Sequence, residues 1–157
     1  MKCLLISLLL IISTAKAQQQ IYNFNQIDSL QKIKIKKLLV FVYTNWCSYC
    51  KAMDEVVFKD KNVVPLLNEQ YYFVKLNAEE KQSFTYQNKQ FIFNQTSGYH
   101  ELAIALANQK KLIFPSTYIL SSNNEIIYQH HEFINASNLS KLLTCFSIKT
   151  SVQLTPE

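Results

Sequence analysis

The chain contains no arginine, and this absence narrows the partners it can bind. Its 16 basic residues are all lysines, which are scattered over many segments and leave a formal net charge of +5 at pH 7. Nucleic-acid sites favour arginine and gather positive charge on one face. We therefore predict no nucleic-acid partner and interpret the lysines as a solvated surface.

Glycine is nearly absent as well, because Gly98 is the only one among 157 residues. Tight turns that need a positive φ angle must then use asparagine, which adopts that conformation more readily than most residues. The segment SSNN at residues 121–124 lies between two apolar runs, and we expect its asparagines to make such a turn.

No apolar run has the roughly 20 residues that span a membrane comfortably. The most extended one, residues 4–12, follows the positively charged Lys2 and precedes the small-residue pattern AKA at residues 15–17. This arrangement is typical of a signal peptide, here residues 1–17. An uncleaved membrane anchor is the alternative.

Cleavage after Ala17 would leave residues 18–157, which is about the size of one domain. We expect a single domain with its core at about residues 26–147. The signal directs export, and a bacterial periplasm is the expected location, with an endoplasmic-reticulum lumen as the alternative. Once the signal is removed, the mature chain is expected to have no stable membrane insertion.

Three cysteines remain after such cleavage, and an odd number argues against a purely structural disulfide framework. They are Cys47, Cys50 and Cys145. An exported protein meets conditions in which disulfides persist. Cys145 lies in an apolar stretch near the end, so we expect a buried or half-buried thiol that packs as a small hydrophobe.

The hydrophobic pattern predicts helices and strands that alternate along the chain. Short apolar runs predict strands at residues 38–43, 71–77, 117–120 and 125–129. Helical spacing predicts helices at residues 25–34, 51–60, 61–70, 99–109 and 135–146, and β-rich runs around Asn88 and Lys89 predict a hairpin. This order implies an α/β fold with a central sheet and helices on both faces. One face of the second helix is expected in the core, with Met53, Val56 and Val57.

The segment WCSYCK, residues 46–51, places two cysteines directly after the apolar run LLVFVYTN. A redox pair, half of a zinc site and two buried thiols are the alternatives. Residues three apart on a helix are about 5–6 Å apart, which matches the Cα separation of a disulfide, about 5.5–6 Å. At the start of a helix, the thiolate of Cys47 would be stabilised and its pKa lowered below about 8.5, with Cys50 one turn deeper.

Zinc is the weaker alternative because a structural site needs four ligands, usually from a second CxxC or a paired histidine set. The remaining candidates lack that spacing; they are Cys145, His100, His130 and His131. We predict no metal, and we expect the histidines on the surface or in loops.

These residues together resemble the thioredoxin superfamily over about residues 26–146. WCSYCK is similar to the family's WCxxCK motif, with the same tryptophan before it and the same lysine after it. The segment FPST, residues 114–117, resembles the family's cis-proline loop, and the chain closes with a hairpin and a helix. Within the superfamily, the chain is most similar to exported bacterial thioredoxin-like proteins with an insertion after the second strand.

The resemblance implies a thioredoxin-like fold, with a central mixed β-sheet flanked by helices and an inserted β-hairpin. It implies an extracytoplasmic thiol–disulfide oxidoreductase that reduces or exchanges protein disulfides, with Cys47 as the nucleophile and Cys50 as the resolving thiol. No cofactor is expected beyond the Cys47–Cys50 disulfide. The partners would be protein disulfides and an electron-donating or electron-accepting redox partner. The expected substrate-binding residues are Trp46, Tyr49, Phe114 and Pro115.

Two features depart from the family pattern. Phe41 lies six residues before the first cysteine, where broadly reducing thioredoxins have a buried aspartate that helps to deprotonate the resolving thiol. Ser48 and Tyr49 stand where thioredoxin has Gly-Pro. A non-catalytic module that binds partners on a thioredoxin scaffold is therefore the alternative function, because a fold does not fix an activity.

Overall fold

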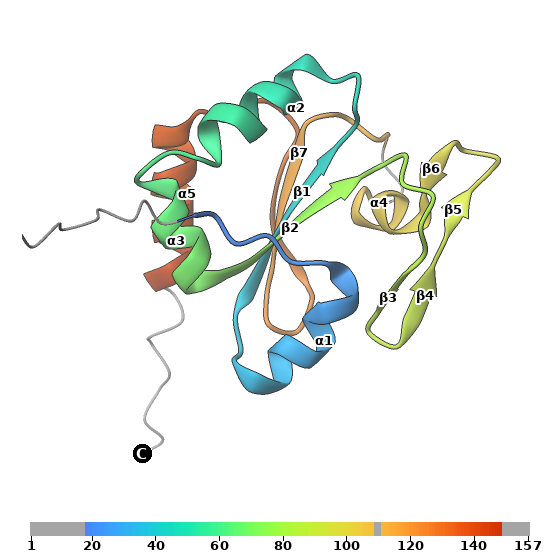
Figure 1. Cartoon of the computed structure of the whole chain (residues 1–157), viewed down its shortest axis with the longest axis horizontal. Helices are drawn as coiled ribbons and strands as arrows, with labels where there is room; N and C mark the ends of the chain where they lie inside the picture. Colours follow the sequence, from blue (N-terminus) through green and yellow to red (C-terminus); the bar gives the residue numbers. More distant parts are fainter. Residues whose placement is uncertain (1–17, 109–110, 149–157) are drawn as a thin grey trace, which may run out of the picture.

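The computed structural model describes residues 18–108 and 111–148. The expected signal peptide, residues 1–17, lies outside the described residues. Figure 1 shows the elements coloured along the chain. They are α1 (Phe24–Ile33), β1 (Lys37–Tyr43), α2 (Ser48–Ala52), η1 (Met53–Val57), α3 (Val63–Gln70), β2 (Tyr71–Asn77), β3 (Phe84–Tyr86), β4 (Lys89–Phe91), β5 (Phe93–Asn94), β6 (Tyr99–His100), α4 (Glu101–Leu106), β7 (Ser116–Leu120), β8 (Ile126–His130) and α5 (Ala136–Ile148).

The central sheet has the strand order β2-β1-β7-β8. β1 pairs parallel with β2 and antiparallel with β7, and β7 pairs antiparallel with β8. The sheet is therefore mixed, as predicted. The five inner residues of β1 are all buried, because a continuous apolar run suits a strand that is covered on both faces.

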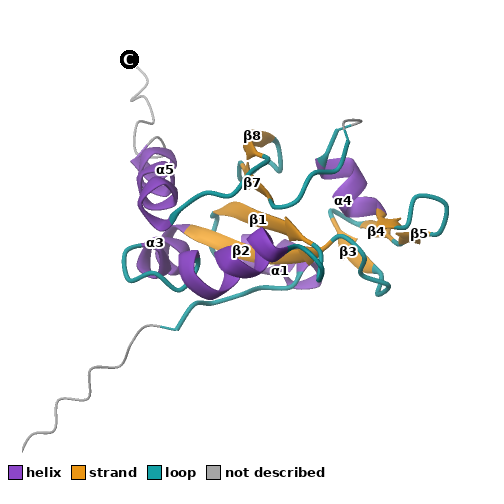
Figure 2. Ribbon diagram, turned by 90° about the horizontal axis from the view of Figure 1, so that it is seen from above, coloured by secondary structure: helices purple, strands orange, loops and turns teal. Residues whose placement is uncertain are grey.

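The two faces of the sheet carry separate hydrophobic cores. Side chains alternate between the faces along a strand, so Val40 and Phe41 of β1 enter different cores. The first core includes residues of α1, α4 and the inserted hairpin, and the second includes residues of α2, η1, α3 and α5. Figures 1 and 2 show α3 and α5 on one side of the molecule and α4 with β3 to β5 on the other. The predicted fold class is thus confirmed.

The inserted hairpin, β3 with β4, follows β2 as predicted. Its turn uses Gln87 and Asn88 at φ angles of 54° and 57°, in the left-handed region that asparagine tolerates. The ring of Tyr86 lies 5.2 Å from that of Phe24 on α1, so the hairpin packs on the first core. A second ribbon, β5 with β6, escaped the sequence prediction because each of its strands has only two residues.

The helical segment after the cysteines contains a wider turn, and one predicted core residue is wrong. η1 is π-helical: the Phe58 N–H donates to the Met53 carbonyl, five residues earlier, at 3.0 Å. Because a π turn holds more residues than an α turn, Val57 rather than Val56 returns to the face of Met53. Met53 and Val57 are buried, whereas Val56 is 67% exposed.

Two further expectations about burial are wrong. Cys145 on α5 is exposed, because it lies two residues after the buried Leu143 and a helix turns by about 200° over that distance. His100 is fully buried rather than at the surface. Its ring lies 4.7 Å from that of Phe84, so the inserted hairpin helps to cover it. The other two histidines are partly exposed, as expected; they are His130 and His131.

Candidate active site

β1 leads directly to the cysteines, since it ends at Tyr43 and α2 begins at Ser48. The Ala78 N–H donates a 2.8 Å hydrogen bond to the Tyr43 carbonyl, which ties this end of β1 to the segment after β2. The turn between strand and helix closes with a 3.3 Å bond from the Cys47 N–H to the Thr44 carbonyl. Cys47 thereby occupies the N-cap position of α2.

Cys47 and Cys50 form a disulfide, with their Cα atoms 5.2 Å apart. The Cys50 N–H also donates to Cys47 Sγ over 3.1 Å. Cys47 is 7% exposed and Cys50 is 2% exposed, so the second cysteine lies deeper, as the helical spacing predicts. The fold therefore brings the two sulfurs of WCSYCK together where the sheet meets the first turn of a helix.

Aromatic side chains lie on the surface around the disulfide. Trp46 and Tyr49 are 65% and 66% exposed. Trp46 packs edge-on against Phe114, with ring centroids 5.7 Å apart, and its indole N–H donates to Glu79 Oε1 over 3.0 Å. The ring of Tyr49 lies 6.2 Å from that of Phe133, which follows β8. No sequence signal points to Phe133, because this contact joins segments far apart in the chain.

The Phe114–Pro115 peptide bond is cis, as the FPST segment predicts. Pro115 is buried directly before β7, and Phe114 packs against both hydrophobic cores. One of these cores contains both cysteines of the disulfide. Through the contact of Phe114 with Trp46, the structure brings the FPST loop beside the cysteine segment.

A cavity of about 170 Å³ adjoins the disulfide. Its lining comes from the end of β1, the turn after it and the helical segment; the residues are Phe41, Tyr43, Thr44, Asn45, Cys47, Cys50, Lys51 and Asp54. Phe41 is fully buried and puts a ring where the thioredoxin pattern has a carboxylate. Asp54 is the one carboxylate among these described lining residues. No motif in the sequence around Asp54 predicts a role for this residue.

Asp54 is held by Lys75 of β2. The Nζ atom of Lys75 lies 2.6 Å from Asp54 Oδ2 and 5.5 Å from the centroid of the Tyr43 ring. Lys75 pairs in register with Phe41, so both side chains stand on the cysteine-bearing face of the sheet. Burial, with smaller effects of Asp54 and Glu80, raises the pKa of Tyr43 above 10. Its phenol therefore stays protonated at neutral pH.

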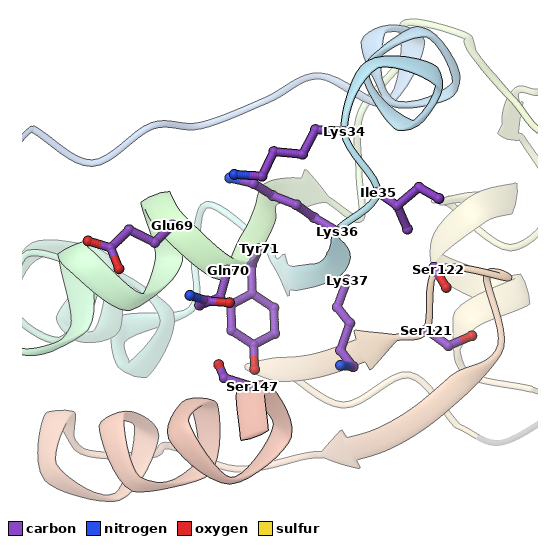
Figure 3. Close-up of a pocket in the computed structure, with 10 residues that line it drawn as sticks. All are labelled: Lys34, Ile35, Lys36, Lys37, Glu69, Gln70, Tyr71, Ser121, Ser122 and Ser147. Atoms are coloured by element: carbon purple, nitrogen blue, oxygen red, sulfur yellow. The ribbon is translucent and has the colours of Figure 1, made fainter. Parts of the chain in front are cut away.

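Figure 3 shows the residues that line a second cavity, of about 250 Å³. It adjoins the start of β1, whereas the disulfide follows the end of β1. Lys34, Lys36 and Lys37 line it, together with residues of α3, β2, α5 and the turn after β7. Lys36 Nζ donates to the Asn68 carbonyl over 2.6 Å, and burial lowers the pKa of Lys36. No cysteine lines this cavity, so it is separate from the candidate redox site.

Within residues 18–108 and 111–148, no three histidine, cysteine, aspartate or glutamate side chains gather in a way that suits a metal ion. Over the same ranges, none of the helices is both long enough and apolar enough to cross a membrane.

Comparison with known proteins finds one matching family, described as Thioredox_DsbH, Protein of unknown function, DUF255. The match extends over residues 17–144 and so includes the cysteine segment and the FPST loop. No curated protein matches the chain.

Several solved structures have a similar fold. A thioredoxin from Thermus thermophilus is 14% identical, with a TM-score of 0.61, over 85% of this chain and 90% of that one. A disulphide isomerase from Xylella fastidiosa Temecula1 is 15% identical, with a TM-score of 0.55, over 77% of this chain and 88% of that one. A protein called DsbH oxidoreductase is 15% identical, with a TM-score of 0.57, over 83% and 85%. At these identities the likeness shows a shared thioredoxin fold.

Proposed function

The chain belongs to the family described as Thioredox_DsbH, Protein of unknown function, DUF255, and from this membership we propose that it is an extracytoplasmic thiol–disulfide oxidoreductase that reduces or exchanges protein disulfides. The observation that carries the proposal is the Cys47–Cys50 pair, closed as a disulfide at the N-cap of α2. The thioredoxin fold supports it, because solved structures named disulphide isomerase and DsbH oxidoreductase have the same fold.

The reaction transfers two electrons between dithiols and disulfides. The Cys47 thiolate attacks one sulfur of a substrate disulfide and forms a mixed disulfide, and the other substrate sulfur leaves as a thiolate. Cys50 then attacks Cys47 Sγ, which closes the Cys47–Cys50 disulfide and releases the reduced substrate. Run in the opposite direction, the same steps oxidise a substrate dithiol. No cofactor beyond this disulfide is needed.

The geometry favours Cys47 as the nucleophile and Cys50 as the resolving thiol. Cys47 is the more exposed of the two. Its Sγ atom accepts a hydrogen bond from the Cys50 N–H at 3.1 Å. Cys47 also lies at the positive N-terminal end of the helical segment, and both features stabilise a thiolate. In the reduced protein we expect the pKa of Cys47 to lie below the free-cysteine value of about 8.5.

The aromatic surface around the disulfide supports a protein substrate. Exposed rings give amphipathic contact area at little cost in side-chain entropy. Trp46, Tyr49, Phe114 and Pro115 are proposed to bind the chain that carries the substrate cysteine, and Phe133 extends this surface. The backbone of Phe114 would pair with an extended substrate segment. A separate redox protein would return or remove the electrons.

We further propose that the mature protein is a single thioredoxin-like domain, residues 18–157, released after Ala17 and placed in the periplasm. The support is the positive, apolar and small-residue pattern of residues 1–17. A compartment outside the cytoplasm also suits the chemistry, because disulfides form and persist there.

We expect the purified protein to speed the reduction of insulin disulfides by dithiothreitol, followed as turbidity from the released insulin chains. The Cys47→Ser variant should show no turnover above the uncatalysed background. When the reduced Cys50→Ser variant is mixed with insulin in the absence of dithiothreitol, it should instead accumulate a mixed disulfide with the substrate, which a mass spectrum would detect. Wild-type turnover equal to that of Cys47→Ser would contradict the proposal.

The same variants separate an enzyme from a binding module. A non-catalytic module would bind its partner with unchanged affinity after the Cys47→Ser substitution and would form no mixed disulfide in Cys50→Ser. Lys59→Ser is a matched control, because Lys59 is exposed after η1 and contributes nothing to the cavity or the aromatic surface. It should retain wild-type turnover.

A further inference from the structure

The second step of the proposed reaction requires Cys50 to lose a proton. Only a thiolate attacks a disulfide efficiently, yet Cys50 is 2% exposed. It lies in an apolar cluster that includes Phe41 and Met53. Burial of this kind favours the neutral thiol over the thiolate. A proton acceptor within reach of Cys50 would therefore speed the step, and the phenyl ring of Phe41 cannot be that acceptor.

The cavity of about 170 Å³ connects Cys50 with polar groups. Thr44 lines it, and the Thr44 Oγ1 atom is buried without a hydrogen-bond partner among the described residues. Buried hydroxyls are normally satisfied by protein or by ordered water, and a water molecule takes up about 30 Å³. The cavity thus has the volume and the lining to hold a short chain of waters.

Asp54 lies on this cavity one helical turn after Cys50 and is the one carboxylate among its described lining residues. Its side chain is 37% exposed, and that of Lys75 is 19% exposed. The 2.6 Å contact between them directs the carboxylate toward the sheet rather than leaving it free in solvent. Asp54 therefore lines the cavity and is held in place by Lys75 of β2.

We infer that Asp54 accepts the proton of Cys50, through water in this cavity, when Cys50 resolves the mixed disulfide. This inference rests on the proposed function and adds a residue to it. The S–H bond of Cys50 breaks and its proton passes to the Asp54 carboxylate. The Cys50 sulfur then bonds to Cys47 Sγ, the bond between Cys47 and the substrate sulfur breaks, and the substrate leaves as a thiolate. Asp54 returns the proton to solvent or to that thiolate.

Proton transfer from Cys50 to Asp54 predicts how the rate of resolution depends on pH. Above the pKa of Cys50 the thiol ionises without help, so an acceptor matters only at lower pH. Replacing Asp54 should therefore slow resolution near pH 7, and the loss should be smaller at about pH 10, where a larger fraction of Cys50 is already a thiolate. The other titratable groups on this cavity or in contact with Asp54 are Tyr43 of β1, Cys47, Lys51 of α2 and Lys75 of β2, and Glu80 acts on Tyr43. They are the same in every variant compared below.

The test measures the two steps separately. The reduced, purified protein is mixed with a peptide dimer joined by one disulfide, and aliquots are quenched with acid. A mass spectrum then gives the rise of the mixed disulfide, from attack by Cys47, and its decay, from attack by Cys50. The variants are Asp54→Asn, which keeps the shape, and Asp54→Glu, which restores a carboxylate. The matched control is Glu55→Gln, at an exposed carboxylate on the same segment that pairs with Lys51 at 3.9 Å.

We expect Asp54→Asn to slow the decay at pH 7 about 100-fold, the lower end of what a positioned acid–base group contributes, with the rise unchanged. Asp54→Glu should recover most of this loss, and Glu55→Gln should decay like the wild type. Equal decay rates in Asp54→Asn and Glu55→Gln would overturn the inference. So would a loss of the same size at pH 7 and pH 10, which would indicate a purely structural role. If the wild type forms no mixed disulfide at all, the proposed function itself fails.

Discussion

His100 is the N-cap residue of α4, and its side chain lies beside the first core. Its Nδ1 atom accepts a 3.2 Å hydrogen bond from the Leu102 N–H, and its side chain is fully buried. Burial lowers the pKa of His100 below its usual value of 6.5, although Glu101 and Glu80 act in the opposite direction. The neutral ring is therefore the form that the folded state holds, and protonation at Nδ1 would remove the cap acceptor.

This burial should make stability depend on pH. Above about pH 6.5 the ring is neutral in both the folded and the unfolded chain. Below that value the unfolded chain takes up the proton first, so the free energy of unfolding falls as the pH falls. We expect His100→Asn, which keeps a capping side chain, to show a smaller loss of stability between pH 7.5 and pH 5.5 than the wild type. Urea unfolding of both proteins at the two pH values measures the change in the free energy of unfolding.

A histidine elsewhere provides the comparison. His130→Asn changes a partly exposed ring on β8 and should keep the pH dependence of the wild type. If His100→Asn loses as much stability on acidification as His130→Asn does, burial of His100 is not the source of the effect.

At the scale of the element, the π turn of η1 sets which side chains of the helical segment face the sheet. The Phe58 N–H reaches back five residues to the Met53 carbonyl. This wider turn leaves Val57 buried with Met53 and moves Val56 out to the surface. Asp54 lies in the same turn and faces the cavity beside the disulfide. The local geometry of η1 therefore bears on both the second core and the candidate site.

Two matched substitutions test this geometry. Val57→Ala removes buried methyl groups from the second core and should lower the free energy of unfolding by about 2 kcal/mol. Val56→Ala changes an exposed side chain and should alter it by less than about 0.5 kcal/mol. Chemical denaturation of the two variants gives the comparison. Equal losses, or a larger loss for Val56→Ala, would contradict the outward position of Val56 that the π turn gives it.

At the scale of the whole molecule, the candidate redox site lies where the sheet and both cores meet. The disulfide belongs to the second core, whereas Phe114 packs against both cores and against Trp46. α2, η1, α3 and α5 cover the face of the sheet on the disulfide side, and α1, α4 and the inserted hairpin cover the other face (Figures 1 and 2). The site is thereby supported by a continuous fold rather than by one mobile loop.

The proposed export concerns the whole chain and can be tested directly. Expression of the full sequence in a Gram-negative host should yield a periplasmic protein whose first residue is Gln18, because the small-residue pattern places cleavage after Ala17. Its mass and its N-terminal sequence report the cleavage position. Recovery of a membrane-bound chain that still begins at Met1 would instead support the uncleaved anchor.

The amino-acid sequence predicts many of the helices and strands. The strand predicted at residues 71–77 coincides with β2, and the helix predicted at residues 25–34 differs from α1 by one residue at each end. Hydrophobic periodicity is a local property of the sequence, so the helices and strands that it predicts do not depend on which distant segments pack against them. The closeness of Cys47 and Cys50 is local too, because three residues at a helix start set their separation.

Packing between distant segments lies beyond any local pattern. Phe133 meets Tyr49, and Lys75 meets Asp54, because separate elements fold onto one face of the sheet. His100 is buried although histidine is usually more exposed than this. Burial depends on what covers a side chain, and the covering residues come from elsewhere in the chain. The disulfide could thus be foreseen from WCSYCK, whereas its cavity and the carboxylate beside it required the folded molecule.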